Sequence, residues 1–231
     1  MLRLTLAASR WHRGLPVMTV LGSARRVCSR DTEPMPDAWT HVGRLWTNGE
    51  PFLAVDAALR DAWQGLSNDE YDQIIGLRPE DTSIPVGAGR AVLVGGDGEV
   101  RDDSWIEVFA AAGGLVAIVQ AAGLDYPDVL ARALDYPDVD DQAADTLKVS
   151  SGELAIFSAV FDGTGPYSVP LLPAQPGPVP PVHGPPSPEA CQGLRLPATC
   201  RAYQLKVRRY TALDQSECFA RWLLIPVEPC D

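Results

Sequence analysis

The alternation of hydrophobic and polar positions predicts short strands over most of this chain. Two apolar runs near the start, residues 42–46 and 52–55, flank the segment Thr47-Asn48-Gly49-Glu50. An Asn-Gly pair readily takes the positive φ that a tight turn between two strands requires. We therefore expect these two runs to pair as an opening hairpin.

Later runs predict further strands wherever glycine or alternation bounds them. The runs at 83–86 and 90–94 are rich in β-branched residues and are joined by Gly87-Ala88-Gly89, while a continuous apolar run covers residues 115–120. Three more strands are expected at 153–161, 202–210 and 218–225. In the second of these, apolar and polar residues alternate, so one face of that strand should meet water.

Helix signals are few and short. Asp56 stands at an N-cap position before an apolar face that ends at Gly65, and a second short helix is expected after Ser67, with Glu70 completing a capping box. Its apolar residues Tyr71, Ile74 and Ile75 should face inward. These patterns predict an α+β fold with a predominantly antiparallel or mixed sheet, a few short helices and a single domain over residues 35–231.

A proline-rich segment interrupts the later strands. Residues 165–197 contain eleven prolines, and proline has no backbone N–H to donate to a sheet. We expect residues 162–198 to be a loop insertion, extended or disordered, rather than a boundary between domains.

An internal repeat lies in the middle of the chain. Residues 124–129 and 134–139 both read Leu-Asp-Tyr-Pro-Asp-Val, and together with Asp140, Asp141 and Asp145 they form the densest acidic stretch. The simplest interpretation is a duplication that gives two helix starts, each with Asp at the cap and Pro in the first turn. The spacing does not fit an EF-hand calcium loop, so a solvated acidic face or a partner-facing patch remain the alternatives.

Charge divides the chain by position. Residues 1–30 hold six arginines and no acidic residue. Residues 31–231 hold the remaining 13 of the 19 lysines and arginines and all 30 acidic residues, so they carry a formal charge of −17. Such a body repels nucleic acid and anionic membranes and attracts basic surfaces. No apolar run reaches the roughly 18 residues of a membrane-spanning helix. The expected partner is a basic protein, with no nucleic acid and no membrane involved.

The first 34 residues allow three interpretations. An arginine-rich, acid-free segment is typical of an organelle transit peptide, and its short apolar stretch resembles a poor secretory signal. The interpretation we favour is an upstream start codon, with translation beginning at Met35. Under any of the three, we leave residues 1–34 out of the predicted fold.

The cysteines and histidines offer little chemistry. Five cysteines without a CxxC spacing argue against a zinc site and a dense disulfide scaffold, which leaves reduced thiols or one bridge such as Cys191 to Cys200. The three histidines are scattered, and the chain has no nucleophile elbow, no His-Glu-x-x-His helix and no Walker loop. We therefore predict no cofactor, no metal and no catalytic residues.

The order of several small motifs resembles the immunity protein 21 family of bacterial polymorphic toxin systems. The resemblance covers roughly residues 39–161, and its motifs are Trp46-x-x-Gly49-x-Pro51-Phe52-Leu53, Leu59-x-x-x-Trp63-x-Gly65, Asp69-Glu70-Tyr71-Asp72, Ile84-Pro85-Val86-Gly87-x-Gly89-x-Ala91-Val92-Leu93-Val94-Gly95 and Gly113-Gly114-Leu115-Val116. The resemblance implies a small cytoplasmic α+β protein that neutralises a cognate toxin domain and is not an enzyme. The proline-rich insertion and the first 34 residues depart from the family pattern.

The acidic stretch is the predicted binding surface for that toxin. Aromatic residues often anchor protein interfaces, so two tyrosines join the carboxylates in the candidate set. The candidate partner-binding residues are Asp125, Tyr126, Asp128, Asp135, Tyr136, Asp138, Asp140 and Asp141.

Two other functions stay open at this stage. A small enzyme of unknown chemistry would place Asp69, Asp72 or Glu107 deep in a pocket with a perturbed pKa. An exported acidic binding module would require that the first segment is cleaved. The oligomeric state and the identity of the toxin cannot be predicted from the sequence.

Overall fold

The computed structural model describes residues 38–78, 80–96, 100, 103–182, 192–214 and 216–227. These residues belong to one compact unit, Met35–Asp231. The predictions for residues 1–34, including the choice among three interpretations, lie outside the described residues.

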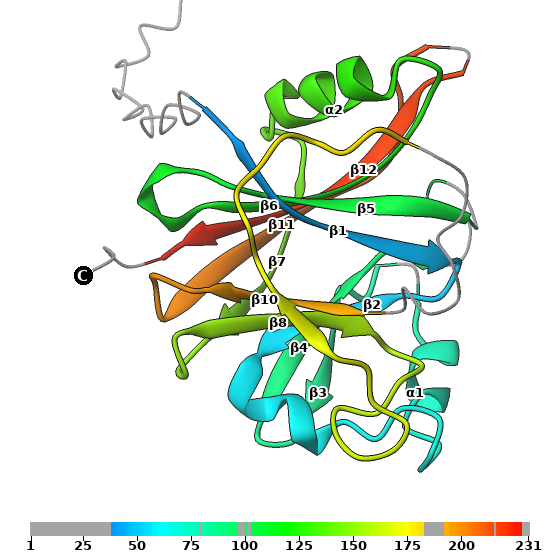
Figure 1. Ribbon diagram of the computed structural model, residues 1–231, viewed down its shortest axis with the longest axis vertical. Helices are drawn as coiled ribbons and strands as arrows, with labels where there is room; N and C mark the ends of the chain where they lie inside the picture. The colour runs from blue at the N-terminus through cyan, green and yellow to red at the C-terminus, as the bar shows by residue number, and fades with distance from the viewer. Residues whose placement is uncertain are drawn as a thin grey trace, which may run out of the picture. The chain divides into compact units, whose positions relative to one another are not determined.

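Two six-stranded sheets make up the fold (Figure 1). The first, which we name sheet A, is antiparallel throughout and has the order β1 (Thr40–Asn48), β5 (Asp103–Ala110), β6 (Val116–Ala122), β12 (Cys218–Pro226), β11 (Ala202–Ala212) and β7 (Gln142–Lys148). Sheet B has the order β3 (Ser83–Val86), β4 (Gly89–Val94), β2 (Phe52–Asp56), β8 (Glu153–Ser158), β10 (Gly193–Pro197) and β9 (Leu171–Pro173). Its β9 and β10 pair in parallel, while its other pairs are antiparallel.

The helices are short and lie outside the sheets. They are the 3₁₀ turns η1 (Ala57–Ala62) and η2 (Ala112–Gly114) and the α-helices α1 (Asp72–Ile75) and α2 (Tyr126–Asp135). The predicted α+β class, with mostly antiparallel sheets and few short helices, is confirmed.

Three apolar clusters form the core. The largest lies between the sheets and joins residues such as Ile106 and Trp222 of sheet A to Phe52 and Ile156 of sheet B. A second covers the outer face of sheet B, where Trp63 is buried. The third lies between the outer face of sheet A and α2, whose buried residues recur at helical spacing. Both faces of each sheet are therefore covered over part of their area, and α2 fixes the position of the acidic stretch.

The expected opening hairpin does not form. β1 and β2 are both strands, but β1 pairs with β5 in sheet A and β2 pairs with β4 and β8 in sheet B. The turn at Gly49, where φ is 100°, carries the chain from one sheet to the other. Alternation predicts a strand but not its partner, and here the nearest strand in sequence is the wrong one.

The proline-rich segment is more ordered than its composition predicts. Two strands of sheet B, β9 and β10, lie within residues 162–198. In β10 the only proline is the last residue, and β9 is a short edge strand that ends on Pro173, so the missing N–H groups do not interrupt the sheet. The expectation of an extended or disordered loop is wrong for these two strands.

The two copies of the repeat adopt different structures. In the first copy Asp125 caps α2 and Pro127 lies in its first turn. In the second copy Leu134 and Asp135 close the same helix, and Tyr136 is extended with ψ 131°, as a residue before proline prefers. The prediction of two helix starts is therefore wrong, because the same six residues begin and end a single helix.

Several local predictions are also wrong. Glu70 does not cap α1; its Oε2 accepts a hydrogen bond from the N–H of Gln64 at 2.6 Å. Ile75 is 72 % exposed rather than inward-facing. The strands β5 and β7 were not predicted at all.

Candidate functional site

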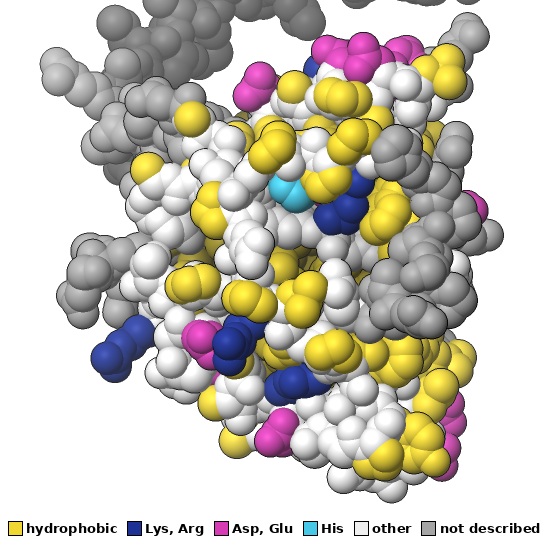
Figure 2. All heavy atoms as spheres, viewed as in Figure 1, with side chains coloured by type: hydrophobic (Ala, Val, Ile, Leu, Met, Phe, Trp, Pro, Cys, Tyr) yellow, Lys and Arg dark blue, Asp and Glu magenta, His cyan; other side chains and the backbone are white. Residues whose placement is uncertain are grey.

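The acidic stretch lies on one side of sheet A, along α2 and the turn that follows it. Figure 2 shows acidic side chains gathered at the end of the molecule where α2 lies in Figure 1. Helix α2 forms here because Asp125 caps its N-terminus and because its buried residues, among them Val129, Leu130 and Ala133, form an apolar stripe toward the sheet. The opposite side of the helix carries exposed carboxylates.

Four of the predicted binding residues are solvent-exposed carboxylates, namely Asp125, Asp128, Asp135 and Asp140. Asp128 forms an i,i+4 ion pair with Arg132 at 3.6 Å, and the attraction is weak because both side chains are exposed to solvent. Asp135 and Asp140 have no ion pair with any other described residue. The surface along α2 therefore carries uncompensated negative charge.

The other four predicted residues are engaged within the protein. Tyr126 is 8 % exposed, and its hydroxyl donates a hydrogen bond to Glu107 at 3.0 Å. Tyr136 packs against Phe219, and Asp138 pairs with Lys206 at 2.6 Å. The Asp141 side chain is fully buried. Tyr126 and Asp141 are thus unavailable to a partner in this structure, and Tyr136 and Asp138 are only partly accessible.

Asp141 belongs to a buried ion cluster at the C-terminal end of α2. Its carboxylate contacts Arg221 at 3.0 Å and Arg208 at 2.5 Å, and the Arg221 side chain is fully buried. Arg221 also donates to the carbonyl oxygens of Ala133 and Tyr136, each at 2.7 Å. A cation at this position satisfies carbonyls that the helix leaves unpaired and interacts favourably with the negative end of its dipole.

A second buried charged cluster lies beside the N-terminal end of α2. Glu107 of β5 is fully buried; one of its carboxylate oxygens accepts hydrogen bonds from Arg44 at 2.7 Å and Tyr126 at 3.0 Å, and the other lies 2.8 Å from His41 Nε2. Burial, together with the negative charge of Glu107, raises the pKa of Tyr126 far above its ordinary value. The tyrosine therefore stays neutral and acts as a donor. Every oxygen of this carboxylate has a partner, an arrangement typical of a structural ion cluster.

The proline-rich segment covers this second cluster. We name residues 174–182 the proline strap (Figure 1). Its Gln175 and Gly177 donate backbone hydrogen bonds to the carbonyls of Val42 and His41, and the carbonyls of Pro180 and Pro181 accept from Arg44 at 2.7 and 3.1 Å. The guanidinium of Arg44 thus connects the strap to Glu107.

The residues named for the enzyme alternative are not brought together. Asp69 and Asp72 are exposed on the segment around α1, whereas Glu107 is buried in sheet A. No group of three or more metal-ligating side chains occurs among the described residues. Within the described part of the chain, no helix is long and apolar enough to cross a membrane.

The cysteines differ from the expectation of reduced thiols. Cys200 is disulfide-bonded, whereas Cys218 is a free, buried thiol. Cys191, named above as a possible partner of Cys200, lies outside the described residues.

Sequence reasoning missed both buried ion clusters. A signal was present for one of them, since Arg221 interrupts the apolar run of residues 219–225, and a cation inside a buried strand requires an anion. For the other, Glu107 stands in the same way between Trp105 and Phe109 in a strand that was not predicted.

Comparison with protein-family models, with curated proteins and with solved structures finds no match to this chain.

Proposed function

We propose that this chain is a non-catalytic immunity protein that binds a cognate bacterial toxin domain and occludes its basic active-site cleft. The proposal combines the motif resemblance with one structural observation. That observation is the set of exposed carboxylates along α2 and the turn that follows it, Asp125, Asp128, Asp135 and Asp140, on a chain whose residues 31–231 carry a formal charge of −17.

The revised interface is smaller than the one predicted from the sequence. It keeps the four exposed carboxylates and leaves out Tyr126 and Asp141, whose side chains are buried. Because α2 is held on the sheet by an apolar stripe and capped at both ends, three of the carboxylates, Asp125, Asp128 and Asp135, are presented on a rigid element. A rigid surface loses little conformational freedom on binding, which favours affinity.

Negative charge on this surface favours rapid capture of a basic partner. Complementary charge raises association rate constants from about 10⁵–10⁶ toward 10⁸–10⁹ M⁻¹s⁻¹ at low salt. The gain should fall with added salt, because the Debye length shrinks to about 8 Å at physiological ionic strength. Speed of this kind benefits a cell that makes a toxin capable of killing it.

The test is co-expression with the cognate toxin domain that the proposal requires. We expect cells that make the toxin domain to survive only when this chain is present. Neutralising Asp128, Asp135 and Asp140 together as Asn variants should slow association at least about tenfold at low salt. Equal killing with and without the chain, or turnover of a substrate by the purified chain, would refute the proposal.

A matched control separates the α2 surface from net charge alone. The triple variant of Asp61, Asp69 and Asp72 to Asn removes the same charge from exposed positions on a different segment. We expect it to slow association less than the α2 variant. If both variants behave alike, the net charge of the chain acts and the α2 surface is not the interface.

The disulfide favours one alternative, an exported acidic binding module. Disulfides persist in oxidising compartments and are rare in the cytoplasm, where the immunity proposal places the chain. Fractionation of cells followed by thiol labelling of Cys200 distinguishes the two. Labelling in freshly lysed cytoplasm supports the cytoplasmic proposal, and protection together with export supports the alternative.

A further inference from the structure

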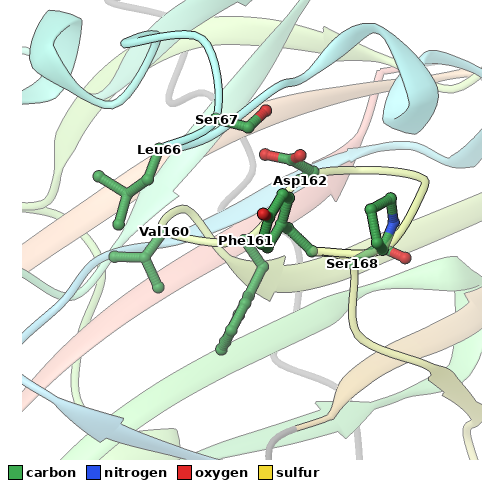
Figure 3. A pocket seen from close by; sticks show the side chains of 8 residues that line it. Leu66, Ser67, Val160, Phe161, Asp162 and Ser168 are labelled. Carbon is green, nitrogen blue, oxygen red and sulfur yellow. The ribbon is translucent and has the colours of Figure 1, made fainter.

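The loop after β8 forms a pocket of about 670 Å³ with the segment between η1 and α1. Its walls are largely apolar and come from Leu66, Val160, Phe161, Pro166 and Tyr167. Figure 3 shows Leu66 and Val160 on the same side of the pocket. A volume of this size is typical of sites for small organic ligands.

One charged group lines this apolar pocket. Asp162 is 7 % exposed, and its Oδ1 is buried and makes no hydrogen bond. The residue forms no ion pair with any other residue that the structure describes. In Figure 3 its carboxylate points toward the side of the pocket where Ser67 lies. Buried carboxylates are ordinarily paired, so an unpaired one beside a cavity is a candidate for binding a cation from outside the chain.

Neighbouring hydroxyls do not satisfy this carboxylate. The Ser67 hydroxyl donates to the carbonyl of Gln64 at 3.0 Å, and the Ser168 hydroxyl donates to the carbonyl of Gly165 at 2.7 Å. Arg60, which lies against the neighbouring residue Gly163, donates instead to the carbonyl of Val169. The negative charge of Asp162 is thus left for a ligand.

The backbone around the pocket is held in place without a ligand. The N–H of Asp162 donates to the carbonyl of Tyr167 at 3.1 Å, and the N–H of Gly163 donates to the carbonyl of Trp63 at 2.8 Å. Leu66 is tied to Val160 by a further backbone hydrogen bond of 3.3 Å. The site is therefore largely formed in the free protein.

We infer that this pocket binds an organic cation, an ammonium or guanidinium group on an apolar body, with Asp162 as the counter-ion. The cation pairs with the carboxylate, the apolar body contacts Leu66 and Val160, and the ring of Tyr167 adds a favourable face for positive charge. Two sources share this chemistry: a free amine, and a lysine or arginine side chain of a bound protein. Only the second source rests on the proposed function.

Binding is tested by titrating ¹⁵N-labelled protein with phenethylamine and with Nα-acetyl-lysine methylamide. We expect saturable shifts of the amide signals of residues 160–168. The uncharged analogue 2-phenylethanol, which matches phenethylamine in shape, should bind at least about tenfold more weakly. Tighter binding of phenethylamine indicates a free amine as the ligand, and tighter binding of the lysine probe indicates a protein side chain.

The Asp162→Asn variant removes the charge and keeps the shape. We expect it to weaken binding of both cations at least about tenfold and to melt at the same or a higher temperature, because an unpaired buried charge has been removed. Asp69→Asn is the matched control: it lies on the facing segment, is exposed, and has a φ of 57° that Asn tolerates, so binding should be unchanged.

Three outcomes overturn the inference. They are equal affinity for the amine and the alcohol, undiminished cation binding in Asp162→Asn, and no binding of either cation at millimolar concentration. Loss of stability in Asp162→Asn would assign the carboxylate a structural role instead. None of these results depends on whether the chain protects cells from a toxin, so the two proposals fail separately.

Discussion

The buried ion cluster at the end of α2 gives the most direct prediction about stability. Replacing Asp141 by Asn leaves the guanidinium of Arg221, which is fully buried, without its anion at 3.0 Å. Removing one partner of a buried pair costs about 3–5 kcal/mol. Arg221 keeps its hydrogen bonds to the carbonyls of Ala133 and Tyr136, so we place the loss at the lower end, about 3 kcal/mol.

Equilibrium unfolding in urea measures this loss, and thermal unfolding gives a second measure. For a domain of this size, about 3 kcal/mol corresponds to a fall in melting temperature of roughly 6–12 °C. The control is Asp135→Asn, an exposed carboxylate of the same acidic stretch, whose effect should stay within about 0.5 kcal/mol. If both substitutions change the unfolding free energy equally, Asp141 is not a buried structural anion and the reasoning is refuted.

A double variant separates charge from packing. In Asp141→Asn combined with Arg221→Met, the fully buried guanidinium is removed together with its anion, and of the cluster only Arg208, which is partly exposed, loses an ion-pair partner. We expect the double variant to be more stable than the sum of the single losses predicts, by about 2 kcal/mol. Strict additivity would show that the two side chains do not interact.

Three further predictions concern other parts of the fold. Burial alone would raise the pKa of Asp56, but hydrogen bonds from two serines and two backbone N–H groups lower it from 3.8 to about 2. The ionised carboxylate therefore stabilises the folded state by roughly 2 kcal/mol above pH 4, and this contribution is lost as the pH falls through 2. In an acid titration, the free energy of unfolding should depend less steeply on pH in Asp56→Asn than in the unaltered protein. Glu107→Gln should cost about 3 kcal/mol in urea unfolding, and a cost below about 1 kcal/mol would contradict a buried ion cluster. Gly65→Ala should be more destabilising than Gly152→Ala by more than about 1 kcal/mol in the same assay. Both glycines have positive φ, but only at Gly65 would the new Cβ lie 2.7 Å from the carbonyl oxygen of Phe161. Equal losses of unfolding free energy would mean that this contact relaxes.

The class of fold could be predicted because strand alternation is a local signal. The runs at 83–86 and 90–94 are β3 and β4, and the run at 218–225 lies in β12. Pairing could not be predicted in the same way, since it depends on which distant strand completes a sheet. The pair β1 and β2 shows this, because each has the expected strand pattern but they belong to different sheets.

The candidate binding surface was predictable in part. Composition identifies an acidic stretch, and Asp128 and Asp135 are exposed as expected. Composition does not show which carboxylates meet a cation from elsewhere in the chain. Asp141 is paired with Arg221, 80 residues away, and Asp138 with Lys206, 68 residues away. Only the folded structure separates the internal anions from those that face solvent.

The pocket at Asp162 had no signal in the sequence. Its walls come from two segments about a hundred residues apart, and a single aspartate in a loop is ordinarily solvated. Its burial depends on the path of the β8–β9 loop over the segment before α1. Such a site can be found only once the two segments are seen together.

The proline strap bears on whether β1 is open to pairing with a strand of another molecule. β1 is an edge strand of sheet A, and a bare edge invites pairing with another molecule. Gln175 and Gly177 of the strap occupy the carbonyls of Val42 and His41 on that edge. The prolines between and beyond them have no N–H to offer a further strand, so the strap ends the hydrogen-bonded ladder on this edge.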